Sequence, residues 1–304
     1  MTGMRYRRLG DCGLMVSIVG LGCNNFGRKL DAAATASVVH AALDAGITLF
    51  DTADIYGDPH GASEMFLGEA LKGAREDVVL ATKFGMDMGT TDWGARGARR
   101  YIMRAVEDSL RRLQTDYIDL YQYHAPDGLT PVEETLRALD DLVRQGKVRY
   151  IGSSQFAGWQ VTDADWTAKV SGLSPFVSTQ QHYNWLHRSP EEELLPACAK
   201  AGVGLLPFFP LESGLLTGVY RRHQAPPPGT RLSGERYKAW LDRADWDRLE
   251  ALEAYATEIG VALLEIAIGG LAAQPTVASV IAGATTPEQI HANVRAGAWT
   301  PSPE

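Results

Sequence analysis

The strongest constraint on the fold is a pattern repeated along the whole chain, in which a short apolar run is followed by an amphipathic stretch. Short apolar runs rich in β-branched residues are typical of buried strands. Candidate strands lie at residues 18–21, 48–50, 78–82, 117–123, 149–153, 176–180, 204–208 and 278–281, and each is followed by a candidate helix. Eight strands that alternate with helices over about 250 residues or more predict a (β/α)8 TIM barrel, an α/β fold. We expect residues 1–304 to form this barrel as a single domain.

Several of the amphipathic stretches carry signals for helix boundaries. A capping residue or a proline stands near the start, and a glycine follows the last turn. The starts lie at Asp31, Thr130-Pro131 and Ser189-Pro190, and the corresponding stops lie at Gly46, Gly146 and Gly202. These signals predict three of the helices that cover the barrel.

Three stretches fall outside the alternation. Residues 5–16 alternate weakly around two glycines, which predicts an N-terminal β-hairpin ahead of the barrel. A loop carrying Trp93 follows Lys83, and a much longer one runs from Phe208 to about Asp245. Long loops in compact domains are usually functional or disordered, and we interpret the longer one as a lid. Both loops are expected to overhang the same face of the barrel.

Charge and composition exclude several classes of protein. A net charge of −8 argues against a nucleic-acid-binding surface, because such surfaces need a basic footprint. The arginine-rich residues 96–112 carry apolar residues at helical spacing, so a solvated helix face is the preferred interpretation and a local basic patch stays an alternative. The chain has no apolar run of about 18 residues, its first eight residues lack the apolar core of a signal peptide, and its three cysteines are scattered. We therefore expect a cytoplasmic protein without disulfides or membrane contact.

Polar residues stand at or just beyond the ends of three predicted strands. Asp51 ends one strand and Tyr56 follows it, while Lys83 and His124 end the next two. Because the carboxyl ends of parallel strands meet at one face, these four side chains are expected to converge. A phenol, with an ordinary pKa near 10, becomes a useful proton donor when an ammonium stabilises its anion and a carboxylate holds the ammonium. The set predicts acid catalysis on a carbonyl group, with the imidazole orienting the carbonyl oxygen.

Two other chemistries are disfavoured by the sequence. The stretch from Gly20 through Gly22 begins like a dinucleotide-binding fingerprint, but Asn25 stands where the third glycine is required. The seven histidines are scattered, without the spacing of a metal site, so no metal is expected.

The sequence resembles the aldo-keto reductase family over nearly its whole length. The resemblance is carried by residues 51–57, 81–85, 109–124, 151–154, 180–184, 210–218 and 283–293. It implies a (β/α)8 barrel, a nicotinamide cofactor bound without a Rossmann domain, and reduction of aldehydes or ketones to alcohols. Matched residue by residue, Tyr56 is the general acid, Lys83 and Asp51 tune its pKa, and His124 orients the carbonyl.

The resemblance also implies a set of cofactor-binding positions. Ser154 and Gln180 match the carboxamide-binding pair, Gln155 stands where the family usually has asparagine, and Phe208 matches an aromatic that stacks on the nicotinamide ring. The whole set comprises Gly22, Cys23, Asn24, Ser154, Gln155, Gln180, Phe208, Phe209, Pro210, Leu211, Ser213, Gly214, Leu215, Gly283, Thr285, Gln289 and Asn293. Cys23 is expected to be a buried, inert thiol.

The choice between the two nicotinamide cofactors stays open at this point. Many family members hold the 2'-phosphate of NADP with a lysine or arginine near Thr285, Thr286 or Gln289, and this chain has none there. A helix amino terminus can still bind phosphate through backbone donors, although residues 286–289 also fit a plain capping box. NADP(H) is the expectation and NAD(H) the alternative.

The substrate is expected to be a small-molecule carbonyl compound. Ile55, Phe84, Trp93 and Trp185 are candidates for an apolar substrate pocket, and ordinary packing is the alternative for each. A second function stays open, a nucleotide-sensing regulatory subunit built on the same barrel, because fold alone does not separate the two. The sequence makes no prediction of the oligomeric state.

Overall fold

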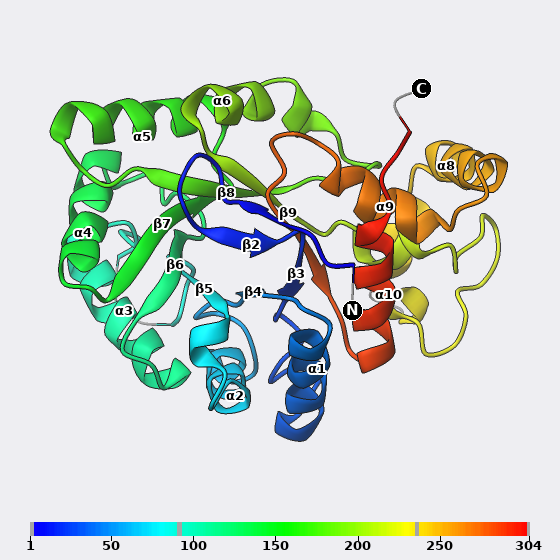
Figure 1. The fold of residues 1–304 in the computed structure, drawn as a ribbon, viewed down its shortest axis with the longest axis horizontal. Helices are drawn as coiled ribbons and strands as arrows, with labels where there is room; N and C mark the ends of the chain where they lie inside the picture. Colours follow the sequence, from blue (N-terminus) through cyan, green and yellow to red (C-terminus); the bar gives the residue numbers. More distant parts are fainter. Residues whose placement is uncertain (1–2, 90–92, 235–236, 303–304) are drawn as a thin grey trace.

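The computed structural model describes residues 3–89, 93–234 and 237–302. Within these residues, an eight-stranded parallel sheet is surrounded by helices (Figure 1). Its strands are β3 (Val19–Gly22), β4 (Leu49–Asp51), β5 (Val79–Phe84), β6 (Ile118–Tyr123), β7 (Val148–Ser154), β8 (Phe176–His182), β9 (Gly204–Phe208) and β10 (Val280–Gly283). All eight predicted strands are confirmed, with boundaries shifted by no more than two residues.

The sheet curves round until its first and last strands meet. Its order is β10-β3-β4-β5-β6-β7-β8-β9, so the strands from β3 to β9 pair in the order of the sequence and β10 pairs with β3. A parallel bridge between Leu205 and Val277 joins β9 to the segment just before β10. The N–H of Leu205 donates to the carbonyl of Thr276, and the N–H of Ala278 donates to Leu205, each over 2.8 Å. The predicted (β/α)8 TIM barrel is therefore confirmed.

Helices alternate with the strands and cover the outside of the barrel. The helices described are α1 (Ala32–Asp44), α2 (Ala62–Ala70), α3 (Arg99–Leu113), α4 (Val132–Arg144), α5 (Gly158–Ser171), α6 (Leu194–Ala201), α7 (Lys238–Asp242), α8 (Trp246–Glu258), α9 (Leu263–Ala272) and α10 (Pro287–Ala298). Short 3₁₀ turns are η1 (Arg75–Asp77), η2 (Ser189–Glu191), η3 (Glu212–Thr217) and η4 (Arg231–Ser233). Among the described residues no single helix is both long and apolar enough to span a bilayer, and only α8 and α9 taken together, bent by 94°, reach that length and hydropathy.

The predicted helix starts are confirmed to different degrees. Asp31 caps α1, because its Oδ1 accepts from the N–H of Ala34 over 2.8 Å. Thr130 was expected to cap α4, but the N-cap is Pro131 and the Thr130 hydroxyl donates instead to Asp127. The helix predicted from Ser189 begins as the 3₁₀ turn η2, and α-helix follows only from α6.

The arginine-rich segment forms α3 with one apolar face. Ile102, Val106 and Leu110 on this helix are buried, while Arg111 is largely exposed. This arrangement confirms the interpretation of residues 96–112 as a helix with a solvated face.

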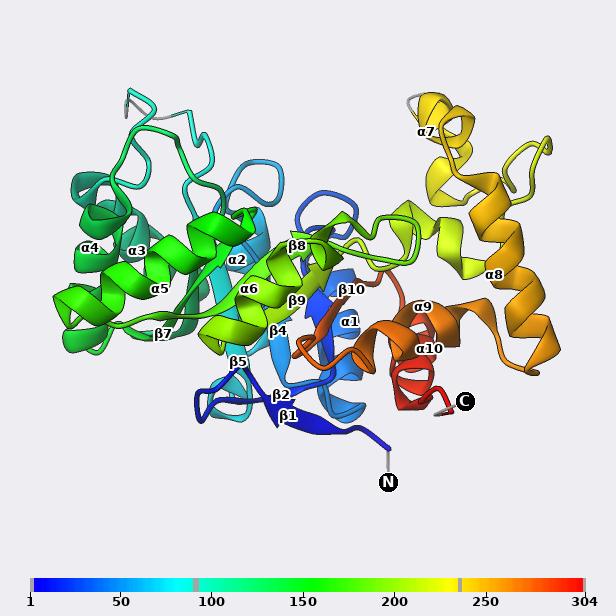
Figure 2. The same cartoon turned by 90° about the horizontal axis from the view of Figure 1, so that it is seen from above.

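The predicted hairpin is present and closes one end of the barrel. Strands β1 (Tyr6–Arg8) and β2 (Met15–Ser17) pair in antiparallel fashion. Leu9 and Val16 of the hairpin are fully buried and pack against residues from inside the barrel, among them Leu49, Leu120 and Leu206. In Figure 2 the hairpin lies below the barrel and the long loops lie above it. The opposite, carboxyl end of the strands is therefore the end available for a site.

The described parts of both predicted overhanging loops lie on that opposite face (Figure 2), whereas residues 90–92 and 235–236 fall outside the described residues. The longer loop, residues 209–245, contains η3, η4 and α7, so it is partly helical where the sequence suggested irregular chain.

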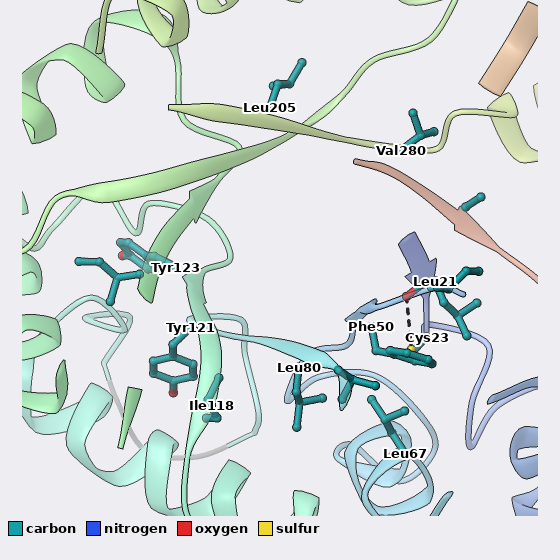
Figure 3. Close-up of a cluster of buried hydrophobic side chains, with 14 of the residues drawn as sticks. Leu21, Cys23, Phe50, Leu67, Leu80, Ile118, Tyr121, Tyr123, Leu205 and Val280 are labelled. Atoms are coloured by element: carbon teal, nitrogen blue, oxygen red, sulfur yellow. Dashed lines mark hydrogen bonds between the residues drawn. The ribbon is translucent and has the colours of Figure 1, made fainter. Parts of the chain in front are cut away.

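The largest part of the core lies between the outside of the sheet and the helices. Figure 3 shows Phe50, Leu80 and Ile118 from the strands with Leu67 from α2. All four side chains are fully buried. Burial of each such side chain stabilises the fold by about 1.5–3 kcal/mol.

Candidate active site

The Asp51 carboxylate lies at the centre of the polar cluster in the mouth of the barrel. It ends β4 and is 3% exposed. Its Oδ2 accepts from Lys83 Nζ over 2.6 Å. Its Oδ1 accepts from the amides of Gln122 over 3.0 Å and Gln180 over 2.5 Å. Each carboxylate oxygen therefore has a donor in place.

Lys83 connects this carboxylate to the phenol. The side chain is 1% exposed, on β5. In addition to Asp51, its ammonium donates to the carbonyl of Thr52 over 3.0 Å and to Tyr56 Oη over 3.5 Å. An ammonium so buried is stabilised only when its donors are paired, and all three of its partners come from residues 51–56.

Tyr56 and His124 meet at the edge of the same cluster. Their rings lie edge to face, with centroids 5.7 Å apart and an interplanar angle of 86°. His124 is 9% exposed, and its Nδ1 has no hydrogen-bond partner among the residues that the structure describes. The structure thus brings the four predicted catalytic residues together.

The surroundings fix the protonation of these groups. Burial raises the pKa of the Tyr56 phenol above its ordinary value, an effect that the Lys83 ammonium partly offsets. Burial lowers the pKa of the Lys83 ammonium, but the Asp51 carboxylate and the Tyr56 oxygen outweigh it, so this pKa is raised. Burial, followed by the charge of Lys83, lowers the pKa of His124 to about 3. At neutral pH the phenol is protonated, the ammonium is charged and the imidazole is neutral.

A groove lies at the same end of the barrel as the polar cluster, between the loop after β9 and the start of α10. Its cavity volume is about 880 Å³. Many of the predicted cofactor-binding residues line it, namely Phe209, Pro210, Leu211, Ser213, Gly214, Gly283, Thr285, Gln289 and Asn293. A cavity of this size is sufficient for a dinucleotide-sized ligand.

Other predicted cofactor residues lie outside the lining of this groove. Gly22 and Cys23 follow one another at the end of β3, with Asn24 next in the chain. Cys23 is fully buried as expected, and burial, followed by the charge of Asp51, raises the pKa of its thiol well above the ordinary value. Leu215 is 1% exposed and contributes to a different, smaller cavity beside His182.

The positions predicted to meet the nicotinamide lie at the ends of β7 to β9. Ser154 is buried at the end of β7, and Gln180 reaches Asp51 from β8. The Gln155 amide donates to the carbonyl of His124 over 3.0 Å, so it is already used within the site. The Phe208 ring is partly exposed at the end of β9 and stacks against His182.

The four predicted substrate-pocket residues have different surroundings. Ile55 lies in the loop between Asp51 and Tyr56, and Trp93 is 75% exposed in the loop after β5. Phe84 is fully buried and stacks against Tyr123, so it has no surface to offer a ligand.

Trp185 is also used in packing. Its indole N–H donates to the carbonyl of Ile266 over 2.7 Å, and its ring packs against Gly270 of α9. Packing within the fold is therefore a sufficient reason for Trp185 at this position, as it is for Phe84.

Sequence reasoning missed three residues of the site. Gln122 donates to Asp51, and its signal was an amide between two tyrosines of a predicted strand. Lys29 and Arg231 line the groove as its cations, from the loops after β3 and β9. These two cations are far from Thr285 and Gln289 in the sequence, and only the folded chain places all four residues around the same groove.

Comparison with known proteins agrees with this geometry. The model of the Aldo/keto reductase family matches residues 18–304. The uncharacterized oxidoreductase YrpG of Bacillus subtilis (strain 168) is 38% identical over 302 residues, covering 96% of this chain and 91% of that protein. L-glyceraldehyde 3-phosphate reductase of Escherichia coli (strain K12) is 33% identical over 310 residues, covering 96% and 87%. A probable voltage-gated potassium channel subunit beta of Arabidopsis thaliana is 35% identical over 304 residues, covering 96% and 91%.

The family match covers almost the whole barrel, and the relatives align over nearly their full lengths. The chain belongs to the aldo/keto reductase family, whose members are oxidoreductases that use nicotinamide cofactors.

Proposed function

We propose that this protein is an NADPH-dependent reductase that converts aldehydes or ketones to alcohols, with Tyr56 as the proton donor. The observation that carries the proposal is the position of the Tyr56 hydroxyl, 3.5 Å from the Lys83 ammonium. A phenol that is protonated at neutral pH and lies beside a fixed ammonium is suited to donate a proton as a carbonyl oxygen becomes an alkoxide.

The remaining residues of the cluster have separate parts in this mechanism. The reduced nicotinamide supplies the hydride when it is bound. Lys83 stabilises the negative charge that develops on the Tyr56 oxygen as the proton leaves. Asp51 keeps Lys83 charged and in place through their 2.6 Å ion pair. Neutral His124 donates an N–H to the carbonyl oxygen, and its pKa of about 3 prevents it from supplying the proton itself.

The groove supports NADP(H) as the cofactor. Two cations line it, Lys29 and Arg231, and the Nε of Arg231 is buried with no hydrogen-bond partner in the described part of the chain. A buried donor without a hydrogen-bond partner destabilises the folded protein unless a ligand accepts from it. Phosphate oxygens are good acceptors for an arginine guanidinium. The amino terminus of α10 adds a favourable dipole beside Thr285. These residues fit a phosphorylated dinucleotide, with NAD(H) as the weaker alternative.

On the substrate side, Ile55 and Trp93 are the predicted residues that we retain in the proposed pocket. Phe84 and Trp185 are left out because the fold uses both in packing. The name of the Escherichia coli relative supports a small aldehyde as the substrate class. The three cysteines are free, which supports a reducing compartment such as the cytoplasm.

The proposal is tested by titrating the protein with NADPH and with NADH, and then measuring oxidation of the preferred cofactor across a panel of aldehydes and ketones. We expect NADPH to bind more tightly, and turnover to appear with at least one class of carbonyl. Tight binding of neither cofactor would contradict the proposal.

A second candidate is a regulatory subunit that binds the nucleotide without appreciable turnover. The name of the Arabidopsis thaliana relative supports it. In that case NADPH would bind tightly, and no carbonyl in the panel would accelerate its oxidation.

A further inference from the structure

The loop that carries Tyr56 is attached to the first turn of α2. The carbonyl of Tyr56 accepts from the N–H groups of Gly61 over 3.1 Å and Ser63 over 3.2 Å. Gly57 has a φ of +98°, and a Cβ added there would lie 2.7 Å from the Cβ of Ala62. A side chain at position 57 would therefore collide with α2, so glycine lets the main chain of residues 56 and 57 lie directly against this helix.

The first turn of α2 is in turn attached to the sheet through Glu64. This carboxylate is fully buried. Its Oε1 accepts from the Thr82 hydroxyl over 2.6 Å, and its Oε2 accepts from Arg112 Nε over 2.6 Å. Thr82 is in β5 and Arg112 is in α3, so one carboxylate joins three elements of the fold. Figure 3 shows the apolar part of the same layer, in which Leu67 of α2 lies near Leu80 of β5.

Thr82 immediately precedes Lys83, and successive side chains of a strand point to opposite faces. Lys83 therefore faces the mouth of the barrel while Thr82 faces the helices. Glu64 therefore binds β5 on its helix-facing side, through Thr82, which is the residue next to Lys83. The same helix holds the main chain of Tyr56 through Gly61 and Ser63.

The surroundings of Glu64 are built to accept its charge. A Cβ added to Gly61 would lie 2.5 Å from Arg112 Cδ. Position 61 therefore needs a glycine, because any side chain there would collide with the Arg112 side chain on its way to Glu64. Asp54 lies in the same cluster, and its Oδ1 has no partner within the described residues. Burial, followed by the charge of Glu64, raises the pKa of Asp54 well above its ordinary value. Arg112 donates to Glu64 and not to Asp54, so the ion pair of this cluster is the one between Glu64 and Arg112, over 2.6 Å.

We infer that Glu64 is a positioning residue, which fixes the distance between the Tyr56 hydroxyl and the Lys83 ammonium through Thr82 on one side and the start of α2 on the other. The inference rests on the proposed function, because it assigns that distance a role in proton donation. An error of about 1 Å in the placement of reacting groups can cost a factor of about 10² in rate, so a small shift of α2 would be measurable.

The test uses Glu64→Gln and Thr82→Val, which remove the charge and the hydroxyl with little change of shape. Asp119→Asn is the matched control. Asp119 also pairs with an arginine, Arg75, over 2.8 Å and also contacts β5, by accepting from the N–H of Leu80 over 3.0 Å. It lies near the opposite end of the strands from Lys83.

We expect Glu64→Gln and Thr82→Val each to lower kcat about tenfold or more, while the KM for the carbonyl and the Kd for NADPH change less than about twofold. The double variant is expected to lose no more than the worse single variant, because both changes break the same connection. Asp119→Asn should lower the Tm while leaving kcat within about twofold. Unchanged kcat in both folded site variants, or an equal loss in Asp119→Asn, would overturn the inference.

Crystal structures of the wild-type and Thr82→Val proteins give a readout that does not depend on turnover. We expect the distance between Lys83 Nζ and Tyr56 Oη to grow beyond 3.5 Å in Thr82→Val, and an unchanged distance would contradict the positioning role. Failure of the proposed function is recognised separately, by absence of carbonyl reduction in the wild-type protein. In that case the structural comparison still tests whether the Thr82–Glu64 hydrogen bond sets the distance between Lys83 and Tyr56.

Discussion

Lys83 Nζ lies 3.5 Å from Tyr56 Oη, and the same ammonium lies 2.6 Å from Asp51 Oδ2. The phenol is therefore the only member of the proposed tetrad that both contacts the ammonium and is protonated at neutral pH. Under the proposed mechanism, this relationship makes Tyr56 the residue that loses a proton and leaves supporting roles to Lys83 and Asp51.

Replacing Tyr56 with phenylalanine removes the proposed proton donor and keeps the ring against His124. We expect kcat to fall by about 10² to 10⁴, because general acid catalysis contributes about this much. The measurement is steady-state oxidation of NADPH with the best carbonyl of the panel. NADPH affinity should be nearly unchanged, and carbonyl reduction close to the wild-type rate would exclude Tyr56 as the donor.

Replacing Lys83 with methionine leaves the Asp51 carboxylate buried without its ammonium. Removing one partner of a buried ion pair typically costs about 3–5 kcal/mol of unfolding free energy. We expect Lys83→Met to lose stability of this size in urea denaturation, together with most of its activity.

The double variant Lys83→Met with Asp51→Asn separates the two effects. Removing both charges should restore most of the stability, because no unpaired charge is left in the core, while the activity stays lost. Recovery of activity in the double variant would show that the charge on Lys83 has no part in catalysis.

The barrel was predictable from the sequence because its signals are local. Each strand was predicted from its own short segment, and Gly46, Gly146 and Gly202 have positive φ at the ends of their helices. Helix starts were less predictable, because the use of a capping residue depends on its neighbours in space. Thr130 has the chemistry of a cap, but Asp127 already engages its hydroxyl.

The proposed site was predictable where a polar residue interrupts or follows an apolar strand. Asp51, Lys83 and His124 all stand at such points. Gln122 has no motif of its own, and its role follows from the inward direction of its side chain toward Asp51. Lys29 and Arg231 are some 200 residues apart in sequence, and no spacing rule connects residues brought together only by closure of the barrel.

His124 predicts how stability depends on pH. The folded protein keeps this imidazole neutral down to a pKa of about 3, whereas the unfolded chain binds a proton below about pH 6.5. Protons therefore favour the unfolded state in this window, and stability is lost as the pH falls from 6.5 toward 3. Between pH 7 and pH 4 we expect wild type to lose about 3 kcal/mol more unfolding free energy than His124→Gln does.

The measurement is urea denaturation of both proteins at each pH. Replacement of the exposed His291 with glutamine is the control, and it should leave the pH dependence of wild type intact. Parallel curves for wild type and His124→Gln would show that His124 is not held neutral by the fold.

Arg231 predicts how the protein distinguishes the two nicotinamide cofactors. Its guanidinium lines the groove with Thr285 and Gln289 and lies 5.9 Å from the Phe209 ring. A charge-assisted hydrogen bond contributes about 1.5–3 kcal/mol, which corresponds to about 10- to 100-fold in affinity. We expect Arg231→Ala to raise the Kd for NADPH by at least tenfold and the Kd for NADH by less than about twofold, measured by fluorescence titration. Arg243→Ala is the control, since Arg243 lines a different cavity, and an equal loss of affinity for both cofactors would place Arg231 on a phosphate that the two cofactors share.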